Sequence, residues 1–387
     1  MTKSFQSPFL DSKLPTTAVS VFSQMSALAE QHQALNLSQG FPNYPASTEL
    51  IALVNRYMEK GFNQYAPMPG CMPLREQIAH KVSDVYGLAV DPETEITITA
   101  GGTQALFTTI ATLVRPGDEV IIFEPAYDSY RPSVELFGGK VVPIRLLAPD
   151  FSIDWQQVRA AISDKTKLIM LNNPSNPAAK VLSPDDLKEL EEILRDSSIF
   201  LLSDEVYEHI VFDGRQHQSA LSYPALRERS FVIASFGKLL HTTGWKLGYA
   251  IAPPELSREF RKVHQFNVFS VNTPMQMAIA TYLKEERRYR DLPAFFQEKR
   301  DFLTEGLRGS RFAVQPSEGT YFLLLSYQGI SDLSEMEFAH HLTINHGVAT
   351  VPIAAFYSEP CEQKLLRLCF AKDTDSLAKA IDLLQKV

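Results

Sequence analysis

Short apolar runs separated by helical patterns are the feature that most constrains the fold of this chain. The runs are rich in Ile, Val, Leu and Phe, as expected of strands that are buried on both faces. Two of the segments between them, 103–114 and 184–195, show helical spacing of apolar residues. Strands alternating with helices predict an α/β fold, in which a mostly parallel mixed sheet is sandwiched by helices. The runs are residues 95–99, 119–123, 167–171, 199–203, 231–235 and 249–252.

The pattern changes after about residue 275 and indicates a second, smaller α+β domain. A long helical stretch is expected from 274 to about 305. It is followed by expected strands at 319–325 and 365–370 and expected helices at 334–347 and 374–386. We therefore expect an N-terminal arm that also supplies part of the small domain, a large ligand-binding domain and a small C-terminal domain, over residues 1–45, 46–280 and 281–387.

Composition excludes several classes of protein. Of the 387 residues, 45% are hydrophobic, which excludes a disordered chain. The net charge of -8 argues against a nucleic-acid or membrane-surface partner, because both select basic patches. The cysteines are odd in number and lack metal-ligand spacing, so we expect a reducing, cytoplasmic setting and no metal site. No run reaches the roughly 18 apolar residues of a membrane-spanning helix, and residues 1–8 lack the apolar core of a secretory signal.

A lysine follows one of the predicted buried strands. Lys238 lies just after the run 231–235, between small residues that would let a bulky ligand approach the backbone. Lys246 follows eight residues later. A partly desolvated lysine near a second cation has a lowered pKa and can act as an amine nucleophile. A surface loop with two solvated lysines explains the same stretch equally well.

Other polar groups follow the predicted strands in the same way. The segment 100–104 combines glycines, a hydroxyl and a helix start, which together suit a phosphate, although an ordinary tight turn also fits. The amides of 172–177 could bind a ligand or merely form a rigid turn. Asp204 could pair with a protonated ring nitrogen or cap the next helix. Arg367, in an apolar strand, suits a carboxylate or a structural salt bridge. The combination matches an aldehyde coenzyme with a phosphate and a pyridine ring, bound at the strand ends.

At this point the chain resembles fold-type I pyridoxal-phosphate-dependent aminotransferases of class I, over nearly its whole length. The resemblance implies an aspartate-aminotransferase-like fold. Its landmarks occur in the family's order and spacing, except that Ala178 and Ala179 stand where the family prefers Thr-Gly. The landmarks are Asn36–Pro42, Gln64–Pro67, Ala100–Gln104, Pro125–Tyr127, Asn173–Pro177, Ser203–Tyr207, Ser235–Lys238, Gly244–Tyr249 and Leu366–Leu368.

The resemblance also implies roles for individual residues. Lys238 matches the catalytic lysine that holds pyridoxal phosphate as an aldimine. Tyr65 matches a tyrosine that reaches the phosphate of a neighbouring subunit, which implies a homodimer with shared active sites. The substrate would be held by Arg367, Asn176, the Gly40 backbone and Phe22. The other implied coenzyme contacts are Gly102, Thr103, Gln104, Ser235 and Lys246 around the phosphate, Tyr127 stacked on the ring, Asp204 at the pyridine nitrogen, and Asn176 and Tyr207 at the phenolic oxygen.

The reaction implied is ping-pong transamination between an amino acid and a 2-oxo acid, through aldimine and ketimine intermediates. Within the family the closest likeness is to methionine aminotransferases and to kynurenine and glutamine aminotransferases. Aromatic residues and the lack of a second marked arginine favour neutral sulfur-containing, amide or aromatic substrates. A kynurenine–oxoglutarate transaminase or cysteine-conjugate β-lyase is the alternative on the same scaffold. Ser235 and Lys238 also fit the S-x-x-K motif of serine acyl-enzymes, but their partner motifs S-D-N and K-T-G are missing.

Overall fold

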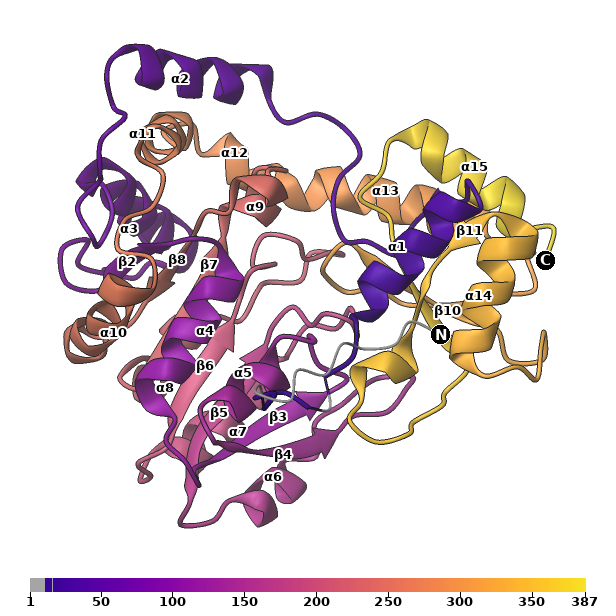
Figure 1. Ribbon diagram of the computed structural model, residues 1–387, viewed down its shortest axis with the longest axis horizontal. Coiled ribbons are helices and arrows are strands. Elements are labelled where there is room, and N and C mark those ends of the chain that lie inside the picture. The colour runs from indigo at the N-terminus through magenta and orange to yellow at the C-terminus, as the bar shows by residue number, and fades with distance from the viewer. Residues whose placement is uncertain (1–10, 16) are drawn as a thin grey trace.

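The computed structural model describes residues 11–15 and 17–387, so the prediction about a secretory signal at residues 1–8 lies outside the described part. Its centre is a seven-stranded sheet with the strand order β2-β8-β7-β6-β5-β3-β4 (Figure 1). All neighbours pair in parallel except those of β8, which runs antiparallel to both β2 and β7. The strands are β2 (Ile96–Thr99), β3 (Glu119–Glu124), β4 (Lys140–Arg145), β5 (Thr166–Asn172), β6 (Phe200–Asp204), β7 (Ser230–Ser235) and β8 (Gly248–Ile251).

Each predicted run from 95 to 252 overlaps one of these strands, whereas β4 was not predicted. The proline explains the omission, because β4 is an edge strand with Pro143 in its interior, and a proline within an apolar run weakens the signal for a strand.

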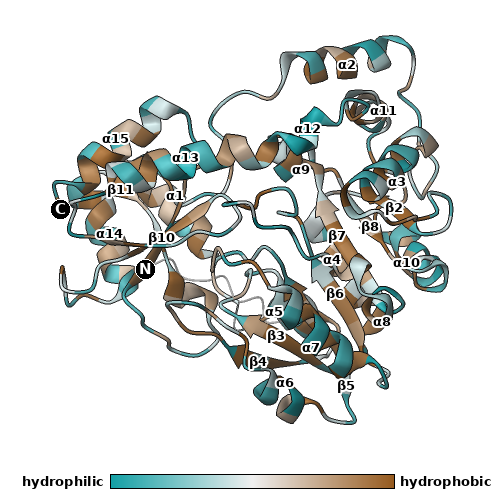
Figure 2. Cartoon of the chain, turned by 180° about the vertical axis from the view of Figure 1, so that it is seen from behind, coloured by the Kyte–Doolittle hydropathy of each residue, from teal (hydrophilic) through white to brown (hydrophobic). Residues whose placement is uncertain are grey.

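Alternate residues of the strands form two cores, one on each face of the sheet. Leu168 and Met170 of β5 belong to the same core as Ile110 of α4, whereas Ile169 belongs to the same core as Leu190 of α7. Figure 2 shows β3, β4 and β5 mostly in the brown of hydrophobic residues. The helices of this part are α3 (Met72–Tyr86), α4 (Gly102–Leu113), α5 (Tyr130–Leu136), α6 (Trp155–Ala161), α7 (Pro184–Leu194), α8 (Pro224–Arg227), α9 (Phe236–Leu239) and α10 (Pro254–Asn267). The predicted α/β class, with a mixed sheet between helices, is therefore confirmed.

A second sheet is four-stranded and antiparallel, with the order β12-β13-β10-β9. The N-terminal segment joins this part of the molecule, because β1 pairs in parallel with β11 and α1 packs against α14. The predicted domain boundaries near residues 45 and 280 stay a prediction. The elements are α1 (Val21–Gln31), β1 (Leu35–Asn36), α13 (Leu292–Gly306), β9 (Ala313–Gln315), β10 (Phe322–Ser326), α14 (Glu335–His346), β11 (Val348–Ala349), β12 (Val351–Pro352), β13 (Leu365–Cys369) and α15 (Thr374–Leu384).

The single long helix expected over 274–305 is three helices. α11 (Thr273–Tyr282) packs against α2 (Thr48–Glu59), and the short α12 (Arg287–Arg290) precedes α13. Pro293 lies in the first turn of α13 and explains why a new helix starts there, because proline suits a helix start but not a helix interior. None of the helices in the described residues is long and apolar enough to cross a bilayer.

Candidate active site

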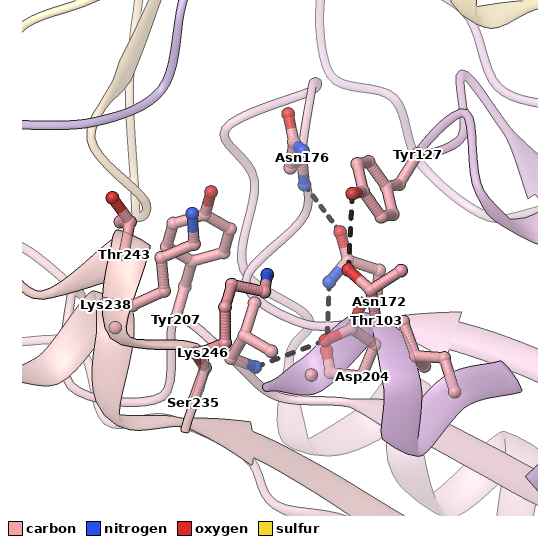
Figure 3. A pocket seen from close by; sticks show the side chains of 14 residues that line it. Thr103, Tyr127, Asn172, Asn176, Asp204, Tyr207, Ser235, Lys238, Thr243 and Lys246 are labelled. Carbon is pink, nitrogen blue, oxygen red and sulfur yellow. Dashed lines mark hydrogen bonds between the residues drawn. The ribbon is translucent and has the colours of Figure 1, made fainter. Parts of the chain in front are cut away.

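A cavity of about 150 Å³ lies where β5, β6 and β7 end and α4 begins. The register of the parallel strands aligns these ends, since Asn172 pairs with Asp204 across β5 and β6. Figure 3 shows polar side chains from these separate elements pointing into the cavity. Among the predicted site residues, those that line it are Gly102, Thr103, Tyr127, Asn176, Asp204, Tyr207, Ser235, Lys238 and Lys246. Asn172, from the segment 172–177 whose amides were possible ligand contacts, also lines it, and so does Thr243, which was not predicted.

Lys238 lies in α9, the short helix that follows β7. The side chain is half-buried, and its Nζ donates a hydrogen bond to the hydroxyl of Tyr321 over 2.8 Å. Burial lowers the pKa of Lys238 from 10.5 to about 8, and the nearby charges of Lys246 and Arg367 act in the same direction. A substantial fraction of the amine is therefore neutral near physiological pH and available as a base or nucleophile.

Lys246 and the start of α4 together form an anion-binding corner. Gly101 precedes α4 with a φ of 83°, and a Cβ at this residue would lie 3.4 Å from the Nζ of Lys246. Lys246 itself has a left-handed φ of 54° as it leaves the 3₁₀ turn at Thr243–Trp245. The free N–H groups and dipole of a helix start favour an anion, and the ammonium group adds a full positive charge. Thr103 adds a hydroxyl 3.5 Å from that of Tyr127.

Gln104, also predicted in this corner, does not line the cavity. Its Oε1 accepts from the backbone N–H of Ala100 over 2.9 Å, and its Nε2 donates to Thr108 over 2.6 Å. The side chain therefore stabilises the turn into α4, and its coenzyme contact stays a prediction.

Asp204 ends β6 and is only 4% exposed. Burial raises the pKa of this carboxyl from 3.8 to about 6, although the hydrogen bond from Tyr130 opposes the rise. The Tyr130 hydroxyl donates to Oδ2 over 2.6 Å, and the backbone N–H of Val206 donates to Oδ1 over 3.3 Å. A buried carboxylate with so few donors would be stabilised by a cation, such as a protonated ring nitrogen.

Arg367 enters from β13 and is 1% exposed. Its guanidinium donates to the side chain of Asn176 over 2.6 Å and to the carbonyl of Ser38 over 3.0 Å. Its Nε has no hydrogen-bond partner, and within residues 11–15 and 17–387 it forms no salt bridge. Burial lowers its pKa to about 10. A buried guanidinium with spare donors suits a carboxylate ligand, and the predicted structural salt bridge is not found.

The remaining predicted residues lie around the cavity rather than in its lining. The Gly40 carbonyl accepts a hydrogen bond from Tyr321. Phe22, at the start of α1, has its ring centre 5.0 Å from the Arg367 guanidinium. Tyr65 does not reach the cavity of its own chain. Its side chain is 81% exposed and contacts the ring of Phe269 edge-on, with centroids 5.2 Å apart.

These features fit a phosphorylated pyridine aldehyde. The half-buried amine suits the aldehyde, the helix start with Lys246 suits the phosphate, and Asp204 suits a ring nitrogen. Gly102 has little room for a side chain, because a Cβ there would lie 3.0 Å from a side-chain carbon of Val206, which also lines the cavity. The described part of the chain holds no group of three His, Cys, Asp or Glu side chains arranged for a metal ion.

Comparison with protein families matches residues 32–384 to class I and II aminotransferases. Curated relatives align over nearly the whole chain. Methionine aminotransferase from Escherichia coli is 48% identical over 97% of this chain and 98% of its own length. A probable N-succinyldiaminopimelate aminotransferase from Mycobacterium tuberculosis is 36% identical, over 96% of each chain. A kynurenine–oxoglutarate transaminase from Dictyostelium discoideum is 33% identical, over 95% of this chain and 94% of its own length.

Solved structures agree. The crystal structure of the Escherichia coli protein YbdL, identified in its description as a methionine aminotransferase, superposes with a TM-score of 0.95 at 48% identity, covering 98% of this chain and 100% of the other. Thermus thermophilus aspartate aminotransferase with maleate gives a TM-score of 0.89 at 29% identity, covering 97% and 99%. These matches confirm the predicted aspartate-aminotransferase-like fold and the predicted enzyme class. The chain belongs to the class I and II aminotransferase family.

Proposed function

We propose that this aminotransferase depends on pyridoxal phosphate and transfers the amino group of a neutral amino acid, such as methionine, to a 2-oxo acid. The observation that carries the proposal is the proximity of three charged groups. Lys238, just after β7, and Asp204, at the end of β6, line one cavity, and Arg367, in the middle of β13, donates to Asn176 of the same cavity. The 48% identity to a methionine aminotransferase supports methionine as a donor.

The coenzyme of this family would be held by the residues that line the cavity. Lys246, Ser235, Thr103 and the start of α4 would bind the phosphate, and Tyr127 would cover the ring. Asp204, Asn176 and Tyr207 would contact the polar atoms of the ring. When bound, pyridoxal phosphate supplies an electron sink for the bonds at the substrate Cα.

Lys238 would both bind the aldehyde carbon and carry the proton. With its pKa lowered to about 8, its neutral Nζ can accept the proton of the substrate Cα and later return one to the coenzyme carbon. Lys246 has a different role, since its charge anchors the phosphate and disfavours a second positive charge on Lys238.

Arg367 and Asn176 would bind the substrate carboxylate. The aromatic rings of Phe22, Phe322 and Phe356 lie within 5.1 Å of the Arg367 guanidinium and would cover it from water. The sequence marks no second arginine for an acidic side chain, which supports neutral side chains in the substrate.

We further propose a homodimer in the cytoplasm. Exposed aromatic residues support the dimer, because Phe266 is 92% exposed and Phe269, beside Tyr65, is 40% exposed. Patches of this kind are typical of protein interfaces. A second copy seated here would cover Tyr65, the residue expected to complete the partner's site. The division into domains at about residues 45 and 280 is part of the same proposal.

The function is tested by kcat/KM for methionine, glutamine, phenylalanine, tyrosine, kynurenine and aspartate with several 2-oxo acids. We expect methionine to exceed aspartate by at least tenfold, because the sequence marks no second arginine to pair with a second carboxylate. A preference for aspartate contradicts the proposed substrate class. A preference for kynurenine, or release of pyruvate from a cysteine conjugate without any 2-oxo acid, selects the alternative of a kynurenine transaminase or β-lyase.

A further inference from the structure

Tyr321 makes a contact with the catalytic lysine that no sequence motif indicated. The residue immediately precedes β10 and is fully buried. Its hydroxyl bridges two parts of the site, since it accepts from Lys238 over 2.8 Å and donates to the carbonyl of Gly40. Gly40 belongs to the N-terminal loop that also supplies Ser38, a partner of Arg367.

The direction of these hydrogen bonds follows from the chemistry of the groups. A phenol has one proton, and the Gly40 carbonyl can only accept. Burial raises the pKa of Tyr321 well above 10, so the phenol keeps its proton at physiological pH. With that proton directed to Gly40, the Tyr321 oxygen must accept from the nitrogen of Lys238. One N–H bond of Lys238 is therefore fixed toward Tyr321.

The Tyr321 ring is held firmly enough to define this direction. It packs edge-on against Tyr207 and Phe322, with centroids 5.1 and 5.0 Å apart, and at a tilt against Phe296, with centroids 5.8 Å apart. The Nζ of Lys238 lies over both tyrosines, 5.5 Å from the Tyr207 centroid and 5.3 Å from the Tyr321 centroid. The free amine therefore has a fixed resting place beside the cavity.

We propose that Tyr321 is a positioning residue for Lys238: its hydroxyl holds one N–H of the free amine, so that the nitrogen stays in one place beside the cavity and its lone pair is left free of this contact. The inference rests on the proposed function of Lys238 as the proton-carrying base. A base held in one orientation needs no reorganisation before it accepts a proton, and loosening such a group by about 1 Å can cost on the order of a hundredfold in rate.

Tyr321→Phe tests the contact, because it removes only the hydroxyl. Tyr327→Phe is the matched control. Tyr327 immediately follows the same strand, is equally buried, and donates to the carbonyl of Leu333 over 2.9 Å. Thermal unfolding of both variants shows whether each retains its fold, and we expect similar, small losses of stability.

The first readout is the pKa of Lys238 in the coenzyme-free protein, measured by competitive acetylation and mass spectrometry across pH. A hydrogen bond to a charged donor is stronger than one to a neutral donor, so Tyr321 favours the protonated amine. Its loss should lower the pKa of Lys238 by about one further unit in Tyr321→Phe and leave it unchanged in Tyr327→Phe. The other titratable groups that act on Lys238 are Asp204 of β6, Lys246 after β7, and Arg367 and Cys369 of β13, which neither variant changes.

The second readout is steady-state kinetics of the loaded enzyme. We expect Tyr321→Phe to lower kcat between about tenfold and a hundredfold, with KM for the amino acid changed less than threefold. An unchanged pKa of Lys238, or a loss that appears only in KM or in stability, overturns the proposal. The acetylation measurement needs no coenzyme and no turnover, so it tests the contact even if the proposed transamination is not observed.

Discussion

Lys238 and Asp204, at the centre of the site, both have pKa values that burial shifts against the charged form. Lys238 titrates near 8 instead of 10.5 and Asp204 near 6 instead of 3.8, both because of burial. Each shifted pKa means that the coenzyme-free protein loses stability when the group is charged. A cationic ring and an aldehyde would relieve both penalties, so the proposed coenzyme would stabilise the folded protein.

The penalty at Lys238 can be measured by Lys238→Met, which keeps the length of the side chain without its charge. Below pH 8 Lys238 is protonated in both the folded and the unfolded protein. The full free-energy cost of burying its charge then lowers the stability of the folded protein. Between 8 and 10.5 the unfolded chain binds one more proton than the folded chain, and stability rises with pH. We expect the coenzyme-free variant to be more stable than the original by about 2–3 kcal/mol at pH 7, with the difference vanishing near 10.5. Thermal unfolding of both proteins at pH 7 and pH 10 measures this difference. A difference in stability between variant and original protein that is the same at both pH values contradicts the shifted pKa.

Tyr130 should support the acidity of Asp204. Tyr130→Phe removes the 2.6 Å hydrogen bond to Oδ2, which raises the pKa of Asp204 above 6 and weakens its negative charge at the ring. We expect about tenfold weaker coenzyme binding, measured by absorbance titration. Tyr289→Phe removes a comparable tyrosine–aspartate hydrogen bond, that to Asp84 at 3.0 Å, and serves as the control that should leave coenzyme affinity unchanged.

At this scale the sequence located the residues whose side chains are costly to bury. Lys238, Asp204 and Arg367 stand out because charged groups are rare next to apolar strands. Tyr130 and Tyr321 do not stand out, because tyrosine is common in cores and its hydroxyl partner lies far away in the chain. The Tyr130–Asp204 contact joins residues 74 positions apart, and a single sequence carries no signal for it.

Among the elements, the close approach of α4 to the sheet determines the geometry of the anion-binding corner formed by Lys246 and the start of α4. Gly248 in β8 permits this approach, since a Cβ there would lie 2.6 Å from the carbonyl oxygen of Ala234 and 3.0 Å from the backbone of Gly101. Both contacts are to backbone, which cannot yield as a flexible side chain can. The glycine therefore positions the anion-binding start of α4.

Gly248→Ala should push α4 away from the sheet. We expect about 1–3 kcal/mol lower stability and at least tenfold weaker coenzyme binding. Gly244→Ala is the control, because no atom lies within 4 Å of a Cβ at this residue, and a change below about 0.5 kcal/mol is expected. Denaturation and coenzyme titration of the two variants distinguish the cases. Equal losses of stability and coenzyme affinity in the two variants would show that the backbone contacts at Gly248 do not determine the position of α4.

Elements with a clear periodicity of apolar residues were predicted from the sequence, whereas elements defined by tertiary contacts were not. The helix expected at 184–195 is α7, whose Ser183 and Asp186 form a capping box. The helix expected over 274–305 is broken twice, and Pro293 signals only the second break, at the start of α13. Strand β4 carries Pro143 in its interior, which argues against a strand, so the sequence alone did not separate it from a loop.

For the whole molecule, the strand order β2-β8-β7-β6-β5-β3-β4 could not be derived from one sequence. Alternation of strands and helices gives the class of fold, but the pairing of β2 with β8 joins segments more than 140 residues apart through contacts that leave no local pattern. The resemblance to a family predicted the aspartate-aminotransferase-like fold, and the strand order itself was not predicted.

The proposed dimer is tested at the exposed aromatic residues near Tyr65. Phe266→Glu should shift the mass in sedimentation from about twice 43.4 kDa towards 43.4 kDa, because a buried carboxylate without a partner is unfavourable. Activity should fall with it if Tyr65 completes the partner's site. Ile344→Glu, on α14 away from α10 in Figure 1, should leave the mass unchanged. If the protein without any substitution is a monomer and is fully active, the proposed dimer is ruled out.

The central claim is that Lys238 holds the coenzyme covalently. Reduction of the coenzyme-loaded protein with borohydride, followed by proteolysis and mass spectrometry, tests it most directly. We expect one pyridoxyl phosphate group, located on the Nζ of Lys238 and released when an amino acid substrate is added before reduction. A label on Lys246 or another lysine, or no label on a protein that still catalyses transamination, contradicts the account.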